Sequence, residues 1–577
     1  MKKKGLVSLF GNVKGYVLPT ILSPLFMIGE VIFEVLIPAK MAVIVNYIQT
    51  AKPQIEFILQ SGLIMIAMAL ASLLCGMASA YVASKASVGF SSNVRRSLFY
   101  KIQGFTFKNV DTFSTASLVT RCTTDVNNVQ VCFMQLIRIM VRAPLMFALS
   151  IVMAFNIDSR MALIFVVAVP LLVATVTVSL ALAFPKFKKL LKGYDEMNQD
   201  VQENLINIRV VKSFVREDYE KEKFRKGAGA LLKWQIAAER IFVLQMPLMQ
   251  LVMYGCKLAI TGIGGTFAIE GTLEIGNLSA MITYAVQILN SLMMLSNVAV
   301  TYVTSRASIF RICEVLQTNE DMKDGTNNRQ INSGSISFCD VDFSYDNNID
   351  DAVLKNINLN INSGETVGII GGTGSGKSSL VQLIPRLYDV DKGDVFVDGI
   401  NVKEYSMQEL RSNVAMVLQK NILFSGTIAD NLRWGDANAT EQEIIDACKA
   451  CQAHQFIMSF PNGYDALLGQ GGVNISGGQK QRLCIARALL KKPKILILDD
   501  STSAVDTNTD TKIRQELKNI PNVTKIIIAQ RVDSVIACDK IVVLDKGQIV
   551  SVGSHEQLLN DCKIYQEVYY SQEGGAK

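Results

Sequence analysis

The residues best suited to chemistry form one glycine-rich stretch. Residues 371–378 fit the pattern G-x-x-x-x-G-K-[ST] at every fixed position, between an apolar run, 366–370, and a helical pattern, 379–384. In such a loop, backbone N–H groups converge on phosphate oxygens and the next helix adds its positive dipole end. Lys377 can neutralise the terminal phosphates, and the Ser378 hydroxyl can ligate Mg²⁺. The alternative is a glycine-rich turn without a ligand, but strand, loop and helix together predict a nucleoside triphosphate site formed by Gly371, Gly372, Thr373, Gly374, Ser375, Gly376, Lys377, Ser378 and Ser379.

Length and composition divide the chain into parts of different character. At 577 residues it is too long for one hydrophobic core. We expect a membrane domain at 1–316, a polar linker at 317–334 and a soluble α/β domain at 335–577. A net charge of +6 is too small to indicate a nucleic-acid partner. The 11 cysteines are scattered without a paired framework, which indicates a reducing compartment.

The first part of the chain contains repeated long apolar runs. Each is long enough to cross about 30 Å of hydrocarbon, and only a helix satisfies its backbone polar groups there. The sequence therefore predicts six transmembrane helices near residues 18–48, 57–83, 131–155, 159–184, 241–268 and 277–303.

The connections between these runs differ in length and charge. Those after the second and fourth runs are long, rich in Lys and Arg, and helical in periodicity. By the positive-inside rule, both long connections, both termini with Lys2–Lys4, and the soluble domain lie in the cytosol of a cell-membrane protein. Bends near 110–113 and 206–209 are candidate contacts with the soluble domain, with a solvated loop as the alternative.

Ionisable residues inside the apolar runs are costly and therefore indicate function or pairing. Glu30 and Glu34 lie at i, i+4 on one helical face of the first run, and Lys257 lies in the fifth. A structural ion pair and a site for a cationic substrate both remain open. Glu30 and Glu34 are accordingly candidate residues of a substrate cavity.

Several motifs of the soluble part form one set. Tyr345 closely follows a strand predicted at 335–343, where its ring could stack on adenine. Four further features follow in order: Gln419, the run Ile475-Ser476-Gly477-Gly478-Gln479, the apolar strand ending at Asp499, and the run Ser503-Ala504-Val505-Asp506. Together with the glycine-rich loop, they resemble the Q-loop, signature, Walker B and D-loop motifs of the ABC transporter nucleotide-binding domain. The six preceding runs extend the resemblance to exporter-type half-transporters, and thus to nearly the whole chain.

The resemblance implies a fold and a set of ligands. The expected fold is an α-helical membrane domain of six transmembrane helices with long cytosolic extensions, followed by an α/β P-loop domain of the ABC type. The expected cofactors are ATP and Mg²⁺, with the metal at Ser378, Gln419 and Asp499. Ser476, Gly477 and Gly478 are expected to act in trans, at the ATP site of a second subunit.

Three positions depart from the family pattern. Asp500 replaces the glutamate that follows the Walker B aspartate, and its side chain is one methylene shorter. A misplacement of about 1 Å can cost about a hundredfold in rate. Gln530 replaces the switch histidine and cannot carry a proton near neutrality. Gln470 stands where related exporters usually have a glutamate before the signature motif.

The resemblance and its departures predict an ATP-hydrolysing translocase with one degenerate site. This chain would bind ATP but cleave it poorly, and would complete the catalytic site of a second half-transporter that has the glutamate and the histidine. The predicted cargo is an amphipathic or drug-like small molecule. The protein, surrounded by membrane lipid, would move it out of the cytosol by alternating access. The alternatives are a homodimeric exporter of lipid or peptide, and an ATP-sensing membrane gate that does not pump.

Overall fold

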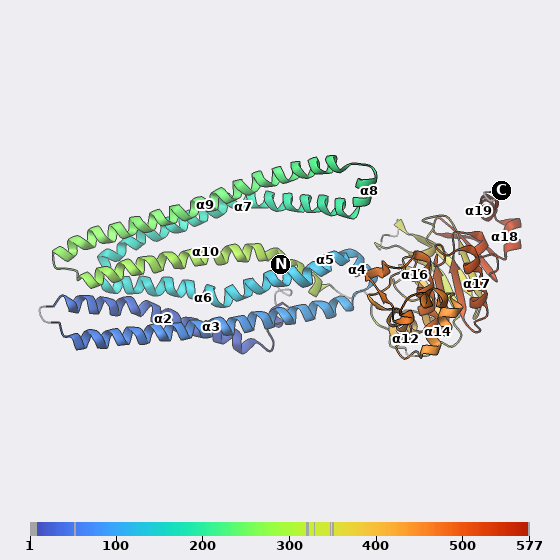
Figure 1. Cartoon of the computed structure of the whole chain (residues 1–577), viewed down its shortest axis with the longest axis horizontal. Helices are drawn as coiled ribbons and strands as arrows, with labels where there is room; N and C mark the ends of the chain where they lie inside the picture. The colour runs from blue at the N-terminus through green and yellow to red at the C-terminus, as the bar shows by residue number, and fades with distance from the viewer. Residues whose placement is uncertain are drawn as a thin grey trace. The chain divides into compact units, whose positions relative to one another are not determined.

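The computed structural model describes residues 9–50, 53–318, 322–327, 329–346, 348 and 351–574. Lys2–Lys4 and part of the predicted linker lie outside these residues. The chain forms two compact units (Figure 1). The first contains Met1–Gln103 and Thr115–Thr318, and the second contains Gly104–Ser114 and Asn319–Lys577.

The first unit consists of long helices. Six helical segments of its described residues are long and apolar enough to cross a membrane, which confirms the predicted helical membrane domain. The longest helices continue well beyond the apolar runs, as the helical periodicity of the connections predicts. The helices are α2 (Val17–Ile48), α3 (Ile55–Gln103), α5 (Thr115–Thr120), α6 (Val126–Ile157), α7 (Ser159–Ile206), α8 (Ile208–Ser213), α9 (Glu217–Ile269) and α10 (Ile275–Gln317), with a π-helical turn at Arg121–Asp125 before α6.

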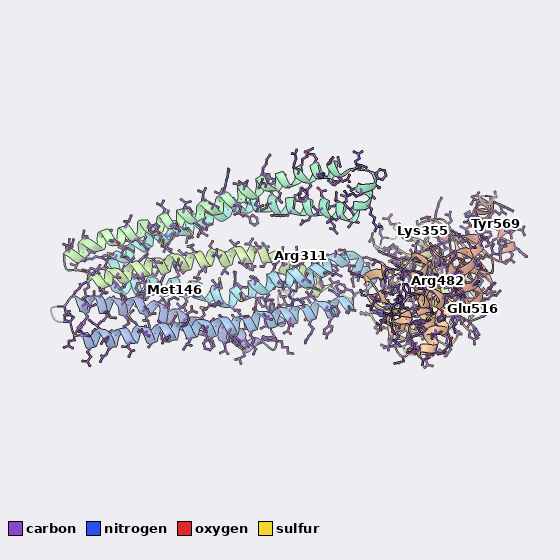
Figure 2. All side chains as sticks on the ribbon, in the orientation of Figure 1. Met146, Arg311, Lys355, Arg482, Glu516 and Tyr569 are labelled. Carbon is purple, nitrogen blue, oxygen red and sulfur yellow. The ribbon has the colours of Figure 1, made fainter. Side chains whose placement is uncertain are left out.

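These helices pack in two groups within the unit. α2 packs against α3, α6 and α10, whereas α7 runs beside α9 and is joined to it through α8 (Figure 1). Val31, Met146 and Tyr284 form part of an apolar core shared by α2, α6 and α10, and Figure 2 labels Met146 within the bundle. Other apolar side chains remain exposed, such as Leu63 on α3 and Leu258 on α9. Exposed apolar helix faces suit contact with lipid.

The second unit contains a six-stranded sheet in the order β12-β11-β3-β10-β9-β6. Its five strands from β11 to β6 are parallel, and β12 adds to the edge in the antiparallel direction. All five residues of β9 are buried, as expected for a strand covered on both faces. The strands are β3 (Thr366–Ile370), β6 (Val414–Val417), β9 (Ile495–Asp499), β10 (Thr524–Ile528), β11 (Lys540–Asp545) and β12 (Gln548–Gly553).

An antiparallel sheet and a set of shorter helices complete this unit and confirm the predicted α/β domain. The sheet has the order β2-β1-β4-β5 and contains β1 (Ile336–Phe343), β2 (Leu354–Ile361), β4 (Lys392–Val397) and β5 (Ile400–Asn401). A further pair joins β7 (Gly426–Thr427) and β8 (Leu467–Leu468). The helices are α4 (Phe107–Phe113), α11 (Lys377–Gln382), α12 (Met407–Asn413), α13 (Ile428–Arg433), α14 (Glu441–Ala450), α15 (His454–Met458), α16 (Gly477–Leu490), α17 (Thr507–Lys518), α18 (His555–Asp561) and α19 (Lys563–Gly574).

Candidate functional site

The glycine-rich loop connects β3 to α11 and is shaped to receive phosphate. Gly374 and Gly376 have φ angles of 82° and 95°, a region that favours glycine. Lys377 Nζ donates hydrogen bonds to the carbonyl oxygens of Gly371 and Gly372, both at 2.8 Å. The loop thus wraps around an ammonium group at the start of a helix. Burial lowers the pKa of Lys377, and the nearby aspartates at the end of β9 oppose that shift.

Asp499, at the end of β9, lies against the beginning of α11. Ser378 Oγ donates a hydrogen bond of 3.0 Å to Asp499 Oδ1. The Asp499 side chain is buried, and burial raises its pKa. A hydroxyl and a carboxylate oxygen at this separation are suitable Mg²⁺ ligands beside a phosphate. These two residues therefore fit the expected metal.

Asp500 and Gln530 lie next to each other because their strands are parallel neighbours. Asp499 on β9 is in register with Ile528 on β10, so the residues that follow each strand meet. Gln530 Nε2 donates a hydrogen bond of 2.9 Å to Asp500 Oδ2. Burial raises the pKa of Asp500, and hydrogen bonds from Gln419 and Gln530 oppose that shift. The Asp500 carboxylate is thus held by side-chain amides.

Ser476 is the N-cap residue of α16 and forms a capping box with Gln479. Its Oγ accepts from Gln479 N at 3.3 Å, and its own N–H donates to Gln479 Oε1 at 2.9 Å. Gly478 packs against the turn after β9, because a Cβ there would lie 2.7 Å from the Ala504 carbonyl oxygen. Ala504 N in turn donates to Gln481 Oε1 at 3.0 Å. Residues 476–478 therefore form a firmly held helix N-terminus, which suits an anion.

Tyr345 lies just beyond β1 and is 38% exposed. Its hydroxyl lies 2.9 Å from Ser379 Oγ on α11. Its ring makes edge contacts with Phe343 and Tyr388, at centroid distances of 4.9 and 5.1 Å. A supported and partly exposed ring beside the phosphate loop suits stacking on a base.

In the first unit, the two predicted carboxylates share one arginine. Arg142 on α6 pairs with Glu30 Oε1 at 2.6 Å and with Glu34 Oε2 at 2.8 Å. Lys257, the basic residue considered from sequence, instead lies 5.7 Å from the Tyr254 ring centroid. The sequence analysis did not single out Arg142, although a charge inside the third apolar run was a visible signal. A single guanidinium thus joins both carboxylates.

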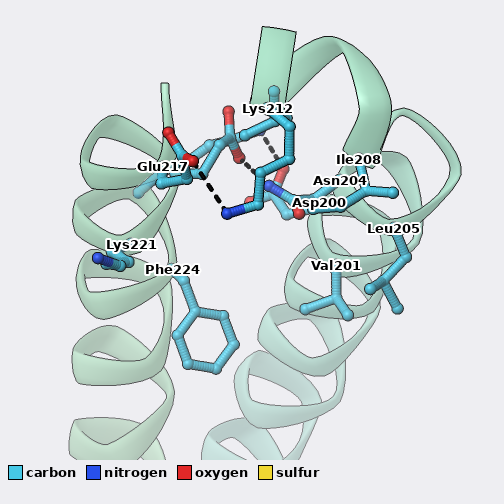
Figure 3. A pocket seen from close by; sticks show the side chains of 12 residues that line it. Asp200, Val201, Asn204, Leu205, Ile208, Lys212, Glu217, Lys221 and Phe224 are labelled. Carbon is cyan, nitrogen blue, oxygen red and sulfur yellow. Dashed lines mark hydrogen bonds and ion pairs between the residues drawn. The ribbon is translucent and has the colours of Figure 1, made fainter. Parts of the chain in front are cut away.

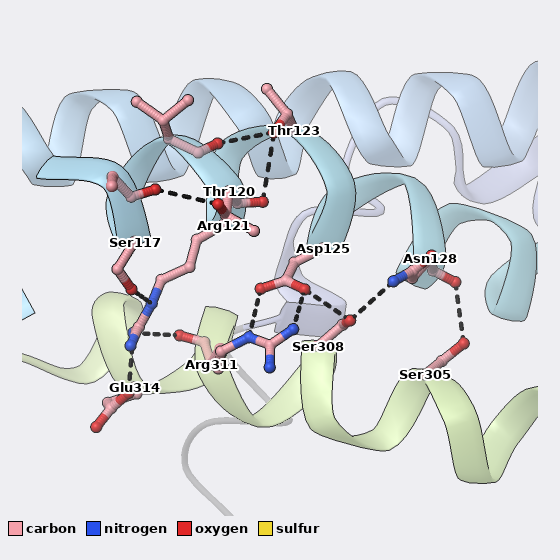
Figure 4. Close-up of polar contacts among 12 residues, drawn as sticks. Ser117, Thr120, Arg121, Thr123, Asp125, Asn128, Ser305, Ser308, Arg311 and Glu314 are labelled. Carbon is pink, nitrogen blue, oxygen red and sulfur yellow. Dashed lines mark hydrogen bonds and ion pairs between the residues drawn. The ribbon is translucent and has the colours of Figure 1, made fainter. Parts of the chain in front are cut away.

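A second polar group of the first unit was not predicted. Asp125, at the π-helical turn, is fully buried and pairs with Arg311 on α10 (Figure 4). Ser308 Oγ donates to Asp125 Oδ1 at 2.7 Å, and Arg121 pairs with Glu314 at 2.8 Å. No motif marks these residues, because the contacts join positions far apart in the sequence.

A cavity of about 370 Å³ lies where α7, α8 and α9 meet (Figure 3). Apolar side chains line it, including Leu205 and Phe224. Ion pairs border it, among them Lys212 with Glu217 at 2.9 Å. This tip contains the second bend expected from the sequence.

Comparison with known proteins agrees with this geometry. Residues 20–292 match the family described as ABC transporter transmembrane region, and residues 354–503 match the family described as ABC transporter. The uncharacterized ABC transporter ATP-binding protein YfiB of Bacillus subtilis is 36% identical over 563 residues, which cover 97% of this chain and 98% of that protein. The chain belongs to the ABC transporter family.

Two further relatives carry more specific names. The putative multidrug export ATP-binding/permease protein YgaD of Bacillus subtilis is 32% identical over 484 residues, 83% of each chain. The ATP-dependent lipid A-core flippase of Desulfotalea psychrophila is 34% identical over 472 residues, 79% of this chain and 80% of that protein. This ABC transporter is thus an exporter-type half-transporter, a multi-pass membrane protein whose membrane domain is fused to an ATPase domain.

The position of Tyr345 leads to a prediction for nucleotide binding by this ABC transporter. Tyr345→Ala should weaken ATP binding about tenfold, because base stacking on an aromatic ring contributes about 1–3 kcal/mol. Tyr345→Phe should bind nearly as well as the unchanged chain, because the ring remains. Titration of a fluorescent ATP analogue checks both variants. Unchanged affinity in the alanine variant would remove Tyr345 from the site.

Proposed function

We propose that this ABC transporter is one subunit of a heterodimeric exporter that moves amphipathic or drug-like compounds out of the cytosol by alternating access. Its own Walker site binds ATP but cleaves it poorly. The observation that carries the proposal is the pairing of Asp500 with Gln530, at the positions where the family has a glutamate and a histidine. Both departures affect cleavage, whereas the loop that would hold phosphate is complete.

The geometry of this pair supports weak catalysis. A general base must accept a proton from water within hydrogen-bond reach. One Asp500 oxygen already accepts from the Gln530 amide, and the side chain is shorter than that of glutamate. Gln530 offers an N–H donor but no titratable group. The site is therefore suited to retain ATP, with Mg²⁺ held by Ser378, Gln419 and Asp499.

The signature segment, residues 476–478, keeps the family pattern, in contrast to Asp500 and Gln530. Ser476, Gly477 and Gly478 keep a capped helix N-terminus, which can bind the terminal phosphate of ATP. We infer that they complete the site of a partner half-transporter that carries the catalytic glutamate and histidine. The complex then has one retaining site and one cleaving site.

The same proposal assigns domains and orientation. The membrane domain covers 1–316, the linker 317–334 and the nucleotide-binding domain 335–577. Both termini face the cytosol and the protein lies in the cell membrane, since the basic residues concentrate in the long connections.

Two other functions have some support. The lipid named for the flippase relative favours a lipid exporter, which could be a homodimer. Slow cleavage at Asp500 is also compatible with a membrane gate that senses ATP without pumping. Transport into inverted vesicles containing both subunits separates a pump from a gate: accumulation against a gradient supports a pump, whereas equilibration alone supports a gate.

The carboxylates of α2 lead to a prediction about cargo. The Glu34 side chain is 35% exposed although it pairs with Arg142, so one face of the pair is accessible. Glu34→Gln should weaken the binding of cationic compounds about tenfold, because a hydrogen bond to a charged group contributes about 1.5–3 kcal/mol. The binding of neutral compounds should change little. Competition binding of matched cationic and neutral compounds measures this, with Glu270→Gln in an exposed loop as control. Equal loss for both classes would make Glu34 purely structural.

A further inference from the structure

The loop that carries Gln530 is held by one side chain of α19. Gln572 Nε2 donates a hydrogen bond of 2.9 Å to the Gln530 carbonyl oxygen, and Gln572 Oε1 accepts one of 2.8 Å from the Val532 N–H. Among the described residues, neither of these two backbone groups has another hydrogen-bond partner. One side-chain amide therefore fixes the chain on both sides of Arg531.

The helix that provides this amide is anchored beside the loop. α19 packs against α18 (Figure 1), and the Tyr565 hydroxyl on α19 lies 2.8 Å from His555 Nδ1 at the start of α18. Tyr565 is fully buried, in an apolar cluster that also contains Val532. Gln572 follows Tyr565 by seven residues and therefore lies on the same face of the helix. The packing of Tyr565 thus holds Gln572 close to its two backbone partners.

Gln530 lies at the edge of the sheet where the phosphate loop begins. β10 is parallel to β3, with Ile528 beside Ile369, so residue 530 is level with Gly371. The Gln530 side chain is exposed, so its direction depends on where the backbone beside it is held. A glutamine amide has two N–H donors, so one can serve Asp500 and the other a phosphate oxygen.

We propose that Gln572 is a positioning residue of this chain's ATP site. By fixing the backbone on both sides of Arg531, it keeps the Gln530 amide directed at Asp500 and at the terminal phosphate of bound ATP. Because the donor is oriented before ATP binds, less conformational entropy is lost on binding, and the gain appears mainly as slower release. The inference rests on the proposed ATP-retaining role of the pair formed by Asp500 and Gln530.

The first test measures the release of ATP from the complex of this chain with its partner. The complex is loaded with labelled ATP and chased with excess unlabelled ATP, and the label that stays bound as uncleaved ATP reports the retaining site. Gln572→Met keeps the aliphatic part of the side chain but removes both hydrogen bonds. It should speed release about fivefold, the scale of one net hydrogen bond. An unchanged release rate overturns the inference.

A second glutamine of the same helix provides the matched control. Gln566 Nε2 donates to the carbonyl oxygens of Leu559 and Asn560, at 2.6 and 3.2 Å, and so binds α19 to the end of α18. Gln566→Met also removes two hydrogen bonds to backbone groups, and it should leave the release rate unchanged. Equally fast release in both variants would show a general loosening of α19 and overturn the inference.

The second test asks whether Gln572 acts through Gln530. In a Gln530→Ala background, Gln572→Met should add no further increase in the release rate, whereas an additive increase contradicts the inference. If Gln530→Ala speeds release but Gln572→Met does not, the inference alone falls. Unchanged release in Gln530→Ala removes the proposed role of the Asp500 and Gln530 pair as well.

A third variant separates the two hydrogen bonds and does not depend on the stability of Gln572→Met. Gln572→Glu keeps an acceptor for the Val532 N–H but has no donor for the Gln530 carbonyl oxygen when it is ionised. It should also speed release, by about threefold. Release as slow as in the unchanged chain would show that the contact with Gln530 has no part in retaining ATP and would overturn the inference.

Discussion

Ser476→Arg should reduce the ATPase rate of the complex to a few per cent or less, a loss of about 2–3 kcal/mol or more in transition-state stabilisation. The guanidinium would occupy the space in front of the α16 N-terminus, where the terminal phosphate of the partner's ATP is proposed to bind. Steady-state ATPase measurements on the variant co-purified with its partner check this expectation.

A second serine provides a matched control. Ser554 begins α18 with the same capping box, formed with Gln557, and is not part of the signature segment. Ser554→Arg loses an equivalent cap, worth about 1 kcal/mol, so it reproduces the stability cost alone. Comparable loss of ATPase activity in both variants would contradict a specific role for Ser476.

Arg142→Ala should destabilise the membrane domain more than other single changes within it. The substitution leaves the buried Glu30 and the more exposed Glu34 without their cation. Removing the partner of a buried charge costs about 3–5 kcal/mol, and the exposed Glu34 pair contributes less. Glu30 Oε2 already has no hydrogen-bond partner among the described residues, so the remaining charge is poorly compensated. The thermal unfolding temperature in detergent measures the loss.

Arg138 serves as the control for this substitution, because it lies one turn earlier on α6. In the part of the chain that the structure describes, no ion pair joins Arg138 to a carboxylate. Adding Glu30→Gln and Glu34→Gln to Arg142→Ala should restore part of the stability, since no charge is then left uncompensated. Equal unfolding temperatures for Arg138→Ala and Arg142→Ala would contradict a stabilising triad.

The sequence predicts the architecture well because its signals are local. Apolar runs of membrane-spanning length identify the six helices, and the strand, loop and helix around Lys377 follow from neighbouring residues. The strand predicted to end before Tyr345 is β1, Ile336–Phe343.

Contacts across the fold could not be predicted in the same way. Lys257 and Arg142 are both basic residues of apolar runs, and only helix packing selects Arg142 as the partner of Glu34. The pairing of Asp500 with Gln530 depends on the parallel neighbours β9 and β10, an order that the sequence does not state. Nothing in the sequence distinguishes Tyr388 from other tyrosines, and only the fold places it in contact with both Asp111 and Tyr345.

The most direct test of the asymmetric site is the steady-state ATPase rate of Asp500→Asn, co-purified with its partner and compared with Ser476→Arg. If Asp500 belongs to a site that retains ATP, the asparagine variant should keep most of the activity, within about twofold, because cleavage occurs mainly at the other site. If Asp500→Asn silences the complex as completely as Ser476→Arg, Asp500 is a working general base and the two sites are not functionally different.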